Sequence, residues 1–454
     1  MTPTTMNPPS TKKVYLQTFG CQMNERDSEG VKGLLLTRGY DFTSNIEEAQ
    51  VILYNTCSVR QHAEDRVFGR SGVLSRIKRD RPETVVGIMG CMAQEHGADF
   101  FRRMPSLDLV CGPGNIADIP DLLDRVTKTG TTRLLSTDKI NDFQYTMDHV
   151  DYREHKYRAS VNIMSGCDHK CTYCIVPMTR GIERSRPSQD IVKEIRLLVE
   201  RGFKDILLLG QNVNCYGKKL DENVDFTELL FQIDKNASPA RVRFTTSHPK
   251  DAHPRLFEAM RDLPSVCEHL HLPVQSGSNA ILRRMKREHT REWYLDRISE
   301  YKKIVPNGSI TTDIIVGFCG ETDADFEETK KLMKEVEYDS SYIFKYSVRP
   351  GTPASKLEDN VPEKIKDERL QELLALQKAM TFAKNSKTIG QSIEVLFDQV
   401  TSGHSQERCV GRTRTFKRVA VDSPLSLEGQ ILNVNIQQVV NETLIGSLTP
   451  TQNT

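Results

Sequence analysis

Three cysteines within eight residues constrain this chain more than any other feature. Cys167, Cys171 and Cys174 lie just after a strand-like run at residues 160–164. Three thiolates on one loop can hold a [4Fe–4S] cluster through three of its irons, whereas a cluster held by protein alone needs four. The fourth iron then keeps an open position, as a catalytic zinc ion does, where the amino and carboxylate groups of a cofactor can bind. The alternative is a structural zinc site completed by His169 or by a distant ligand.

Length, charge and cysteine content exclude several other classes of protein. The 454 residues are enough for about three domains. The formal charge is +1, with 62 Lys plus Arg against 61 Asp plus Glu, so contacts with a polyanion must come from a local patch. The mean hydropathy is -0.48, and no apolar run approaches the ~18 residues of a membrane span. The polar amino-terminal tail does not resemble a signal peptide. The eleven cysteines therefore favour metal or redox chemistry over disulfides. We therefore expect a cytoplasmic protein.

The first segment, residues 13–135, alternates apolar runs with amphipathic stretches. This pattern is typical of βα units around a parallel sheet. Runs at 14–16, 51–54 and 85–89 are the expected strands, and each is followed within about five residues by a cysteine: Cys21, Cys57 and Cys91. Because ligands bind at the carboxyl ends of parallel strands, we expect these three cysteines to converge.

The rest of the chain divides into a linker and two further domains. We expect a loose tail at 1–12, a linker at 136–156, a second domain at 157–385 and a third at 386–449. Six strand-like runs in the second domain predict an open or incomplete (βα) barrel, at 159–164, 206–209, 242–246, 269–272, 312–316 and 342–346. Ser188 is expected to cap a helix that ends at Gly202, and Pro362 to begin a helix that runs to about Lys384. Short alternating runs after Ser386 favour a small antiparallel β-barrel.

The setting of the first cysteine loop is more specific than its spacing. Residues 164–181, MSGCDHKCTYCIVPMTRG, resemble the radical S-adenosylmethionine enzymes. Three amino-terminal motifs and one in the second domain resemble the methylthiotransferases within that group: TFGCQMN at 18–24, NTCSVR at 55–60, GCMAQ at 90–94 and HLPVQSGS at 271–278. The resemblance runs from about residue 13 to residue 449. It implies an α/β protein with an amino-terminal parallel-sheet domain, a central six-unit open barrel of the radical S-adenosylmethionine type and a carboxy-terminal barrel similar to a TRAM domain.

The resemblance also implies the chemistry. It places one [4Fe–4S] cluster on Cys167, Cys171 and Cys174 and a second on Cys21, Cys57 and Cys91. Two molecules of S-adenosylmethionine would be used in each turnover, one as methyl donor to a sulfur on the second cluster and one as radical source. No catalytic side chain is expected, because the cofactor carries the chemistry. The implied reaction is methylthiolation of C2 of N6-isopentenyl adenosine at position 37 of tRNA, with the target base between the two clusters.

Two groups of residues are candidates for cofactor and RNA contacts. S-adenosylmethionine contacts are expected from residues that follow the barrel strands, although ordinary loop capping or core packing explains them equally well: Tyr173, Gln211, Asn212, Gln275 and Ser276. A basic stretch of the third domain is by itself more often a solvated hairpin than a binding site, but the resemblance to a TRAM domain implies that it contacts RNA. Its residues are Arg408, Arg412, Arg414, Phe416, Lys417 and Arg418. The other five cysteines are read as small buried core residues: Cys111, Cys215, Cys267, Cys319 and Cys409. Of these, Cys319 stands where the family usually has proline. Cys111 also follows an apolar run, at 107–110, so the pattern alone does not exclude it as a ligand.

The expected partners are a tRNA anticodon stem-loop that carries N6-isopentenyl adenosine and a protein that donates electrons. No membrane partner is expected, and a monomer is the working assumption. The nearest alternative is a methylthiotransferase that acts on threonylcarbamoyl adenosine or on an aspartate of a ribosomal protein, although Gln22 to Asn24 match the isopentenyl-adenosine group better. An alternative from another class is a non-catalytic RNA-binding protein whose iron–sulfur clusters only stabilise the fold.

Overall fold

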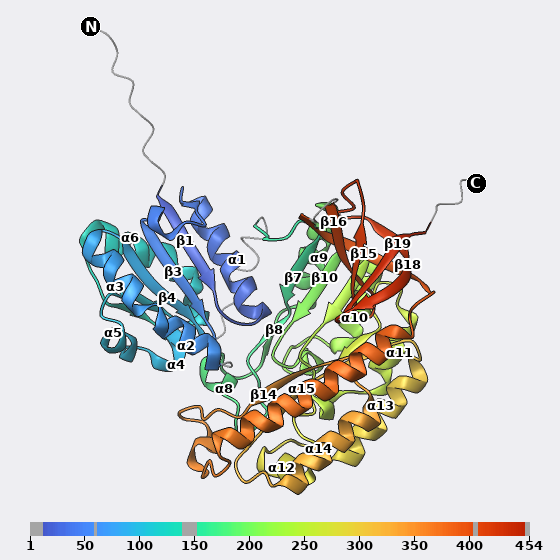
Figure 1. The fold of residues 1–454 in the computed structure, drawn as a ribbon. Coiled ribbons are helices and arrows are strands. Elements are labelled where there is room, and N and C mark those ends of the chain that lie inside the picture. The colour runs from blue at the N-terminus through green and yellow to red at the C-terminus, as the bar shows by residue number, and fades with distance from the viewer. Residues whose placement is uncertain (1–11, 59–60, 139–151, 403–406, 450–454) are drawn as a thin grey trace. The chain divides into compact units, whose positions relative to one another are not determined.

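A computed structural model of the chain describes residues 12–58, 61–138, 152–402 and 407–449. The chain divides into two compact units (Figure 1). The first unit comprises Met1–Glu154, Ser165–Asp168 and Ile175–Arg184, and the second comprises His155–Met164, His169–Cys174 and Ser185–Thr454. Almost all of the tail predicted at 1–12 and most of the linker predicted at 136–156 lie outside the described residues. The second unit holds the predicted third domain and all of the predicted second domain except Ser165–Asp168 and Ile175–Arg184.

The first unit is built on a parallel sheet, as predicted. Six of its described strands pair side by side in the order β2-β1-β3-β4-β5-β6. β3 and β4 are buried along their whole length, which explains why both read as unbroken apolar runs. The strands are β1 (Lys13–Thr18), β2 (Asp41–Phe42), β3 (Val51–Thr56), β4 (Val85–Gly90), β5 (Leu109–Cys111) and β6 (Leu134–Ser136).

Helices cover both faces of this sheet. α1 and α6 pack on one face with the strand side chains around Leu53 and Leu109. α2, α3, α4 and α5 pack on the other face with those around Ile52 and Val86. The helices of this unit are α1 (Gln22–Thr37), η1 (Ile46–Glu48), α2 (Gln61–Gly69), α3 (Ser71–Asp80), α4 (Cys91–His96), α5 (Asp99–Arg103), η2 (Pro113–Asp118), α6 (Ile119–Thr129) and, from the later segment, α8 (Val176–Thr179).

The order of the strands creates a switch point beside β1. From β1 the chain moves outward to β2 and then returns to the opposite side of β1 to form β3. In open parallel sheets, ligands bind at the carboxyl ends of the strands where the order reverses in this way. The carboxyl ends of β1 and β3 are therefore the expected binding edge of the first unit.

The second unit contains the six predicted strands of the central domain, arranged as two parallel sheets. Among the described residues, three strands pair as β11-β10-β7 and three as β12-β13-β14. An isolated parallel bridge between Val242 and Val266 lies between β11 and β12. The predicted six-unit open barrel is confirmed. Its strands are β7 (Arg158–Asn162), β10 (Asp205–Leu209), β11 (Arg241–Phe244), β12 (His269–His271), β13 (Ser309–Val316) and β14 (Ser340–Lys345), and a short pair β8 (Met164–Ser165) and β9 (Arg184–Ser185) follows β7.

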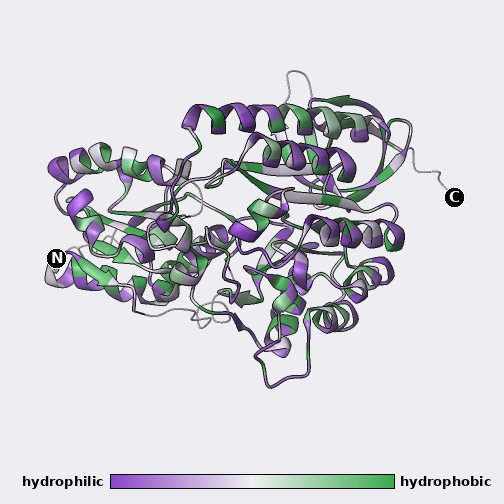
Figure 2. Ribbon diagram, turned by 90° about the horizontal axis from the view of Figure 1, so that it is seen from below, coloured by the Kyte–Doolittle hydropathy of each residue, from purple (hydrophilic) through white to green (hydrophobic). Residues whose placement is uncertain are grey.

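Helices alternate with these strands. In Figure 2 they carry hydrophilic and hydrophobic residues in alternation, as expected for helices that cover a sheet with one face. They are α9 (Ser188–Glu200), η3 (Val213–Cys215), α10 (Phe226–Asn236), η4 (Pro249–Asp251), α11 (Pro254–Asp262), α12 (Asn279–Arg284), α13 (Arg291–Ile304), α14 (Asp323–Val336), η5 (Pro353–Lys356) and α15 (Glu363–Ser386). Within the described parts of the chain, no helix combines the length and apolar character that a membrane span requires.

Two predicted helix ends can be compared with the structure. The expectation that Ser188 caps α9 is wrong, because Pro187 is the capping residue and Ser188 is already helical. Proline supplies a fixed extended conformation before the first turn, so no side-chain cap forms. Gly202, with φ of +90°, follows the last turn of α9 as predicted. Pro362 directly precedes α15, which extends to Ser386.

The carboxy-terminal segment forms the predicted small barrel. In the described residues, five strands close in the order β15-β16-β17-β19-β18. Val395, Val419 and Val434 are among the apolar side chains that fill it. The strands are β15 (Ser392–Ser402), β16 (Glu407–Thr413), β17 (Arg418–Asp422), β18 (Ile431–Val440) and β19 (Thr443–Leu448).

Candidate functional site

The three amino-terminal cysteines lie at the binding edge of the parallel sheet. Cys57 directly follows β3 and Cys91 directly follows β4, and the last residues of these strands, Thr56 and Gly90, are register partners. Cys21 follows β1 and is the residue before the first turn of α1. Since neighbouring strands are about 4.8 Å apart, this register brings all three cysteines to the switch point.

Electrostatic interactions connect these cysteines to one another. A hydrogen bond with Cys57 lowers the pKa of the Cys21 thiol to about 6, against the effect of burial and with help from the charge of Arg180. Burial raises the pKa of Cys91, which also interacts with Cys21 and is hydrogen-bonded to Arg180. A thiol at a helix amino terminus near a cation favours the thiolate, which is the form that binds metal. The structure therefore brings Cys21, Cys57 and Cys91 together, as the sequence predicts.

A pair of buried asparagines joins the loops that carry Cys21 and Cys57. Asn24 Nδ2 donates to Asn55 Oδ1 (2.9 Å) and to the carbonyl of Thr56 (3.1 Å). Asn55 Nδ2 donates in return to the carbonyl of Asn24 (2.8 Å) and to Ser28 Oγ (3.0 Å). Amides that both donate and accept fix the spacing of two loops without adding charge. These asparagines explain the polar positions of the motifs around Cys21 and Cys57.

The second group of cysteines lies on one loop after β8. The N–H of Cys167 donates to the carbonyl of Gly181 (3.1 Å) within the first unit. Cys171 and Cys174 belong to the second unit, where the N–H of Cys174 donates to the carbonyl of Cys171 (3.1 Å). Between these two cysteines, Thr172 fastens the loop: its N–H donates to the carbonyl of Met285 (3.0 Å) and its Oγ1 to that of Arg284 (2.9 Å).

Arg287 places a buried cation beside this loop. Its Nη1 donates to Cys171 Sγ (3.4 Å), and its Nη2 donates to the carbonyl of Pro273 (2.8 Å). The residue is 9% exposed. Arg287 therefore places a buried positive charge directly beside the sulfur of Cys171.

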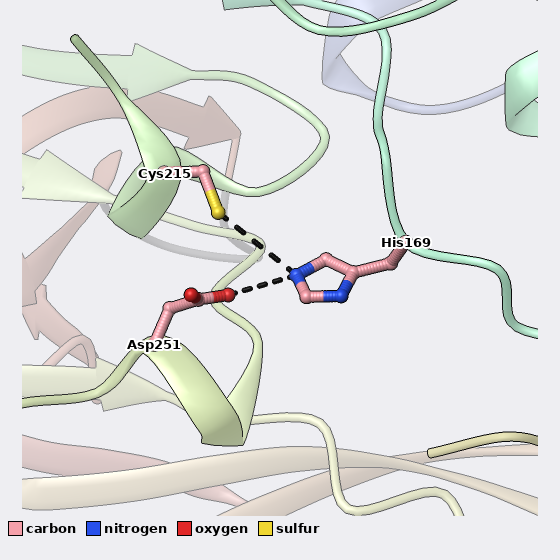
Figure 3. Close-up of side chains that lie close together, drawn as sticks. All are labelled: His169, Cys215 and Asp251. Atoms are coloured by element: carbon pink, nitrogen blue, oxygen red, sulfur yellow. Dashed lines mark hydrogen bonds and ion pairs between the residues drawn. The ribbon is translucent and has the colours of Figure 1, made fainter. Parts of the chain in front are cut away.

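His169, inside the same loop, belongs to a separate polar network (Figure 3). Its Nε2 lies 2.8 Å from Asp251 Oδ2 and its Nδ1 lies 2.7 Å from Glu288 Oε2. Cys215 Sγ lies 3.9 Å from Nε2, and Lys218 Nζ donates to both Cys215 Sγ (3.2 Å) and Asp251 Oδ1 (2.9 Å). Although burial raises the pKa of Asp251, hydrogen bonds from His169 and Lys218 bring it below its usual range.

This network bears on two interpretations of the sequence. Both ring nitrogens of His169 face carboxylates, so His169 does not complete a zinc site with the cysteines of its loop. His169, Cys215 and Asp251 do form a group with metal-ligand chemistry, but an ion pair of Lys218 with Asp251 balances its charge in this structure. The network instead fastens the cysteine loop to the loops after β10 and β11.

The donor sets fit iron–sulfur clusters. Each group offers three cysteines, the ligands that hold such clusters, and each lies near a buried arginine. A [4Fe–4S] cluster held by three rather than four such ligands would keep one iron open to a cofactor or substrate atom.

The five residues predicted to contact S-adenosylmethionine lie in the loops after the strands of the second unit. Asn212 is used within the protein, since its Oδ1 accepts from the N–H of His248 (3.0 Å) and its Nδ2 donates to Asp251 Oδ2 (2.9 Å). Ser276 is fully buried, and its Oγ accepts from the N–H of Ser278 (3.2 Å). Gln275 is buried with φ of +72°, and Tyr173 packs edge-on against Phe318 with ring centroids 6.5 Å apart. Gln211 is half-buried after β10. Their contact with the cofactor stays a prediction.

The predicted RNA-binding hairpin packs against the central domain. Arg414 donates to both carboxylate oxygens of Glu268 (2.8 to 3.1 Å) and to the carbonyl of Val266 (2.7 Å). Lys417 Nζ donates to Asp339 Oδ1 (2.9 Å), and the Phe416 ring stacks on His269 with centroids 5.1 Å apart. These partners lie at the amino-terminal ends of the barrel strands, opposite to the cysteine loop.

The remaining members of the hairpin differ in exposure. The guanidinium of Arg412 lies 4.3 Å from the centre of the Phe416 ring. Arg408 is exposed and paired with Asp422 (2.8 Å), and Arg418 is exposed. RNA binding by the hairpin stays a prediction, and Arg408 and Arg418 are its accessible members.

Four of the five remaining cysteines are buried, as predicted for core residues: Cys111, Cys267, Cys319 and Cys409. Cys215 is the exception. It is half-buried in the polar network of His169, and burial raises the pKa of its thiol to about 12. Its interpretation as an apolar core residue is wrong, because the loop after β10 turns it toward charged partners rather than toward the sheet.

Sequence reasoning missed the two arginines beside the cysteines. Arg180 lies in the motif at 164–181, and Arg287 lies 113 residues beyond Cys174. Their partners are distant in sequence: Arg180 pairs with Asp27, 153 residues away, and Arg287 with Cys171, 116 residues away. The position of Arg180 inside the motif was the only signal available.

Comparisons with known proteins agree with this fold and these cysteines. Residues 161–333 match the Radical SAM superfamily, which implies a [4Fe–4S] cluster and S-adenosylmethionine. Residues 13–112, which carry the amino-terminal cysteines, match the uncharacterized protein family UPF0004.

Solved structures share the fold at low sequence identity. A radical S-adenosylmethionine methyltransferase from Kitasatospora setae, TsrM, superposes with a TM-score of 0.55 at 12% identity, covering 87% of this chain and 78% of that one. The cobalamin-dependent radical enzyme OxsB superposes with a TM-score of 0.51 at 11% identity, covering 81% and 56%. These likenesses concern the fold alone.

Curated relatives match over nearly the full length. A protein of Sulfurihydrogenibium sp. (strain YO3AOP1) is 44% identical over 96% of this chain and 99% of its own length. A protein of Thermoanaerobacter sp. (strain X514) is 43% identical over 96% and 92%. Both are named tRNA-2-methylthio-N(6)-dimethylallyladenosine synthase. With this identity across both units, the chain belongs to the tRNA-2-methylthio-N(6)-dimethylallyladenosine synthase family of radical S-adenosylmethionine enzymes.

Proposed function

We propose that this protein adds a methylthio group to C2 of N6-isopentenyl (dimethylallyl) adenosine at position 37 of tRNA. The observation that carries the proposal is the identity of 44% with a synthase of that name across 96% of this chain. The match includes the carboxy-terminal barrel as well as the two cysteine-bearing domains. The substrate is an anticodon stem-loop that already carries the isopentenyl group.

Two [4Fe–4S] clusters and two molecules of S-adenosylmethionine per turnover are part of this proposal. Cys167, Cys171 and Cys174 hold the cluster that binds S-adenosylmethionine, and Cys21, Cys57 and Cys91 hold the second. When bound, these groups supply the one-electron chemistry that removes hydrogen from an unactivated carbon, which no side chain can do. An electron-donor protein completes the system, and a cytoplasmic location and a monomeric state remain our expectations.

The protein's own residues bind and orient these groups. Thr172 fixes the loop between Cys171 and Cys174 to the end of α12. The positively charged guanidinium of Arg287 lies beside the sulfur of Cys171. Asn24 and Asn55 fix the distance between the loops of Cys21 and Cys57. The switch point of the parallel sheet carries all three cysteines of the second group, at the ends of β1, β3 and β4.

The proposal is tested first on the cellular product. Modified nucleosides from tRNA are compared between cells with and without the gene by liquid chromatography and mass spectrometry. We expect 2-methylthio-N6-isopentenyl adenosine to disappear in the deletion while N6-isopentenyl adenosine accumulates. An unchanged level of the methylthio product would overturn the proposal, and loss of a methylthiolated threonylcarbamoyl adenosine instead would favour the alternative substrate.

Two cysteine variants separate the proposed roles of the clusters in the purified enzyme. Cys171→Ala should abolish formation of 5′-deoxyadenosine from S-adenosylmethionine under reducing conditions. Cys57→Ala should retain that cleavage but form no methylthiolated RNA. Cys409→Ala, in the small barrel, is the matched control and should resemble the parent enzyme in both assays. Methylthiolated product from Cys57→Ala would exclude the second cluster as the sulfur source.

A further inference from the structure

A buried ion pair lies beside the cysteines of the first unit. Arg180 Nη2 lies 2.6 Å from Asp27 Oδ2, and their side chains are 7% and 0% exposed. Isolated charges are expensive to bury, so each of these groups requires the other. Asp27 lies in the second turn of α1, which begins directly after Cys21.

The same guanidinium also reaches the thiols. Arg180 is hydrogen-bonded to Cys91 and interacts electrostatically with Cys21. A guanidinium stays protonated in proteins, and the Asp27 carboxylate beside it balances its buried charge. The positive charge therefore stays fixed between one carboxylate and two of the three thiols.

The backbone around Arg180 is held with little freedom. The N–H of Arg180 donates to the carbonyl of Val176 (2.8 Å), and the next residue, Gly181, accepts from the N–H of Cys167 (3.1 Å). Gly166 permits this approach: its φ is +81°, and a Cβ there would lie 2.0 Å from the carbonyl oxygen of Ile182. The segment that presents Arg180 to Cys91 therefore also fastens Cys167, all within the first unit.

We propose that Arg180 is a positioning residue that orients and charge-balances the cluster held by Cys21, Cys57 and Cys91, with Asp27 as its counter-charge. This inference rests on the proposed function for the cysteine ligands. It goes beyond that function because it names the two side chains, Arg180 and Asp27, that balance the charge of the second cluster.

The proposal predicts opposite effects for the two members of the pair. A reduced cluster carries one more negative charge than an oxidised one, and buried charges and hydrogen bonds to sulfur set its reduction potential. Removing the cation should therefore make the potential more negative. Removing the anion should make it more positive. A pair that serves only to join α1 to the segment after α8 would give no opposed shifts.

The test uses full-length protein with Cys167, Cys171 and Cys174 replaced by Ala, so that one cluster reports. Arg180→Gln, Arg180→Lys and Asp27→Asn are compared with this parent, and Arg79→Gln, at an exposed arginine of the same unit, is the matched control. The readouts are iron and sulfide content and the reduction potential by titration with electron paramagnetic resonance detection. We expect a more negative potential in Arg180→Gln, a potential close to the parent in Arg180→Lys and in the control, and a more positive one in Asp27→Asn.

The outcomes separate this inference from the function on which it rests. If the parent binds no iron, the ligand set is wrong and the proposed function fails. If the parent binds its cluster and both Arg180→Gln and Asp27→Asn keep its potential, the inference about Arg180 is overturned while the ligand set stands. If Arg180→Gln loses iron and Arg180→Lys keeps it, the requirement for positive charge is supported. If both arginine variants lose iron, Asp27→Asn decides: a more positive potential supports the proposal and an unchanged one overturns it.

Discussion

Gly90 stands at the point where the backbone of β4 passes closest to the asparagine pair. Its φ is +95°, and a Cβ there would lie 2.3 Å from Asn55 Oδ1 and 2.6 Å from the carbonyl oxygen of Thr56. A side chain would therefore meet both a disfavoured backbone conformation and a steric clash. Because Cys91 is the next residue, the position of this thiol depends on the glycine before it.

Replacing Gly90 by Ala should destabilise the first unit and release its iron. We expect a loss of more than about 2 kcal/mol in the free energy of unfolding, because conformational strain and displacement of Asn55 add together. Gly130→Ala is the control, since Gly130 has φ of +66° and ψ of +12°, in the left-handed helical region, and a Cβ there meets nothing within 4 Å. It should cost only about 1 kcal/mol and spare the iron. Urea unfolding followed by circular dichroism, together with iron analysis, makes the comparison, and equal losses in the two variants would contradict it.

At this scale the sequence predicts the cysteines better than their surroundings. The apolar runs before Cys21, Cys57 and Cys91 were sufficient to place all three at one edge of a sheet. The residues that hold them were not predictable, because Asn24 and Asn55 are 31 residues apart and Asp27 and Arg180 are 153 apart. Cys215 was misread for a related reason, since two of its polar neighbours, His169 and Asp251, come from other loops.

Among the secondary-structure elements, the hairpin between β16 and β17 has a structural role that its composition did not indicate. Its basic residues suggested RNA, but Arg414 binds Glu268 and the carbonyl of Val266 just before β12. Charge-assisted hydrogen bonds of this kind contribute about 1.5 to 3 kcal/mol each, less for half-exposed pairs such as this.

Arg414→Ala should therefore lower the free energy of unfolding of the second unit, with little effect on the affinity for RNA. We expect a loss of about 2 kcal/mol in stability, because Glu268 and the carbonyl of Val266 lose their donor. Arg418→Ala, at the exposed start of β17, should change stability by less than about 0.5 kcal/mol. Chemical unfolding measures the stability of each variant. Salt-dependent binding of an anticodon stem-loop measures its affinity for RNA. A larger loss of stability in Arg418→Ala than in Arg414→Ala would refute this division of roles.

Element positions followed from periodicity, whereas their pairing did not. All six strand-like runs of the central domain became strands, because buried parallel strands are continuous apolar runs. The break between β11 and β12 into two sheets has no counterpart in the pattern of hydrophobic residues. The Ser188 cap failed because a preceding proline supplies the same start to the helix.

For the molecule as a whole, buried neutral histidines tie the stability of the second unit to pH. Burial lowers the pKa of His269 to about 3, and its Nε2 lies 2.9 Å from Thr311 Oγ1. The folded protein therefore binds no proton at His269 until the pH approaches 3, whereas the unfolded chain binds one below about 6.5. The stabilisation is fully present above pH 6.5 and is lost progressively as the pH falls through that window.

The single tryptophan, Trp293, lies in α13 of the second unit, so its fluorescence reports the unfolding of this unit. Between pH 6.5 and 5.5, the cluster-free protein should lose about 1 kcal/mol more stability than its His269→Gln variant. Urea unfolding at several pH values measures the difference. Parallel pH profiles for the two proteins would show that His269 titrates in the folded state and would contradict the burial argument.

The central claim is that two separate groups of three cysteines each hold one cluster. Its most direct test is anaerobic reconstitution followed by iron and sulfide analysis and Mössbauer spectroscopy of three proteins: the wild type, a variant with Cys21, Cys57 and Cys91 replaced by Ala, and a variant with Cys167, Cys171 and Cys174 replaced by Ala. We expect about eight irons per chain in the wild type and about four in each variant, all in [4Fe–4S] clusters. About four irons in the wild type, with none remaining in one of the variants, would contradict the account.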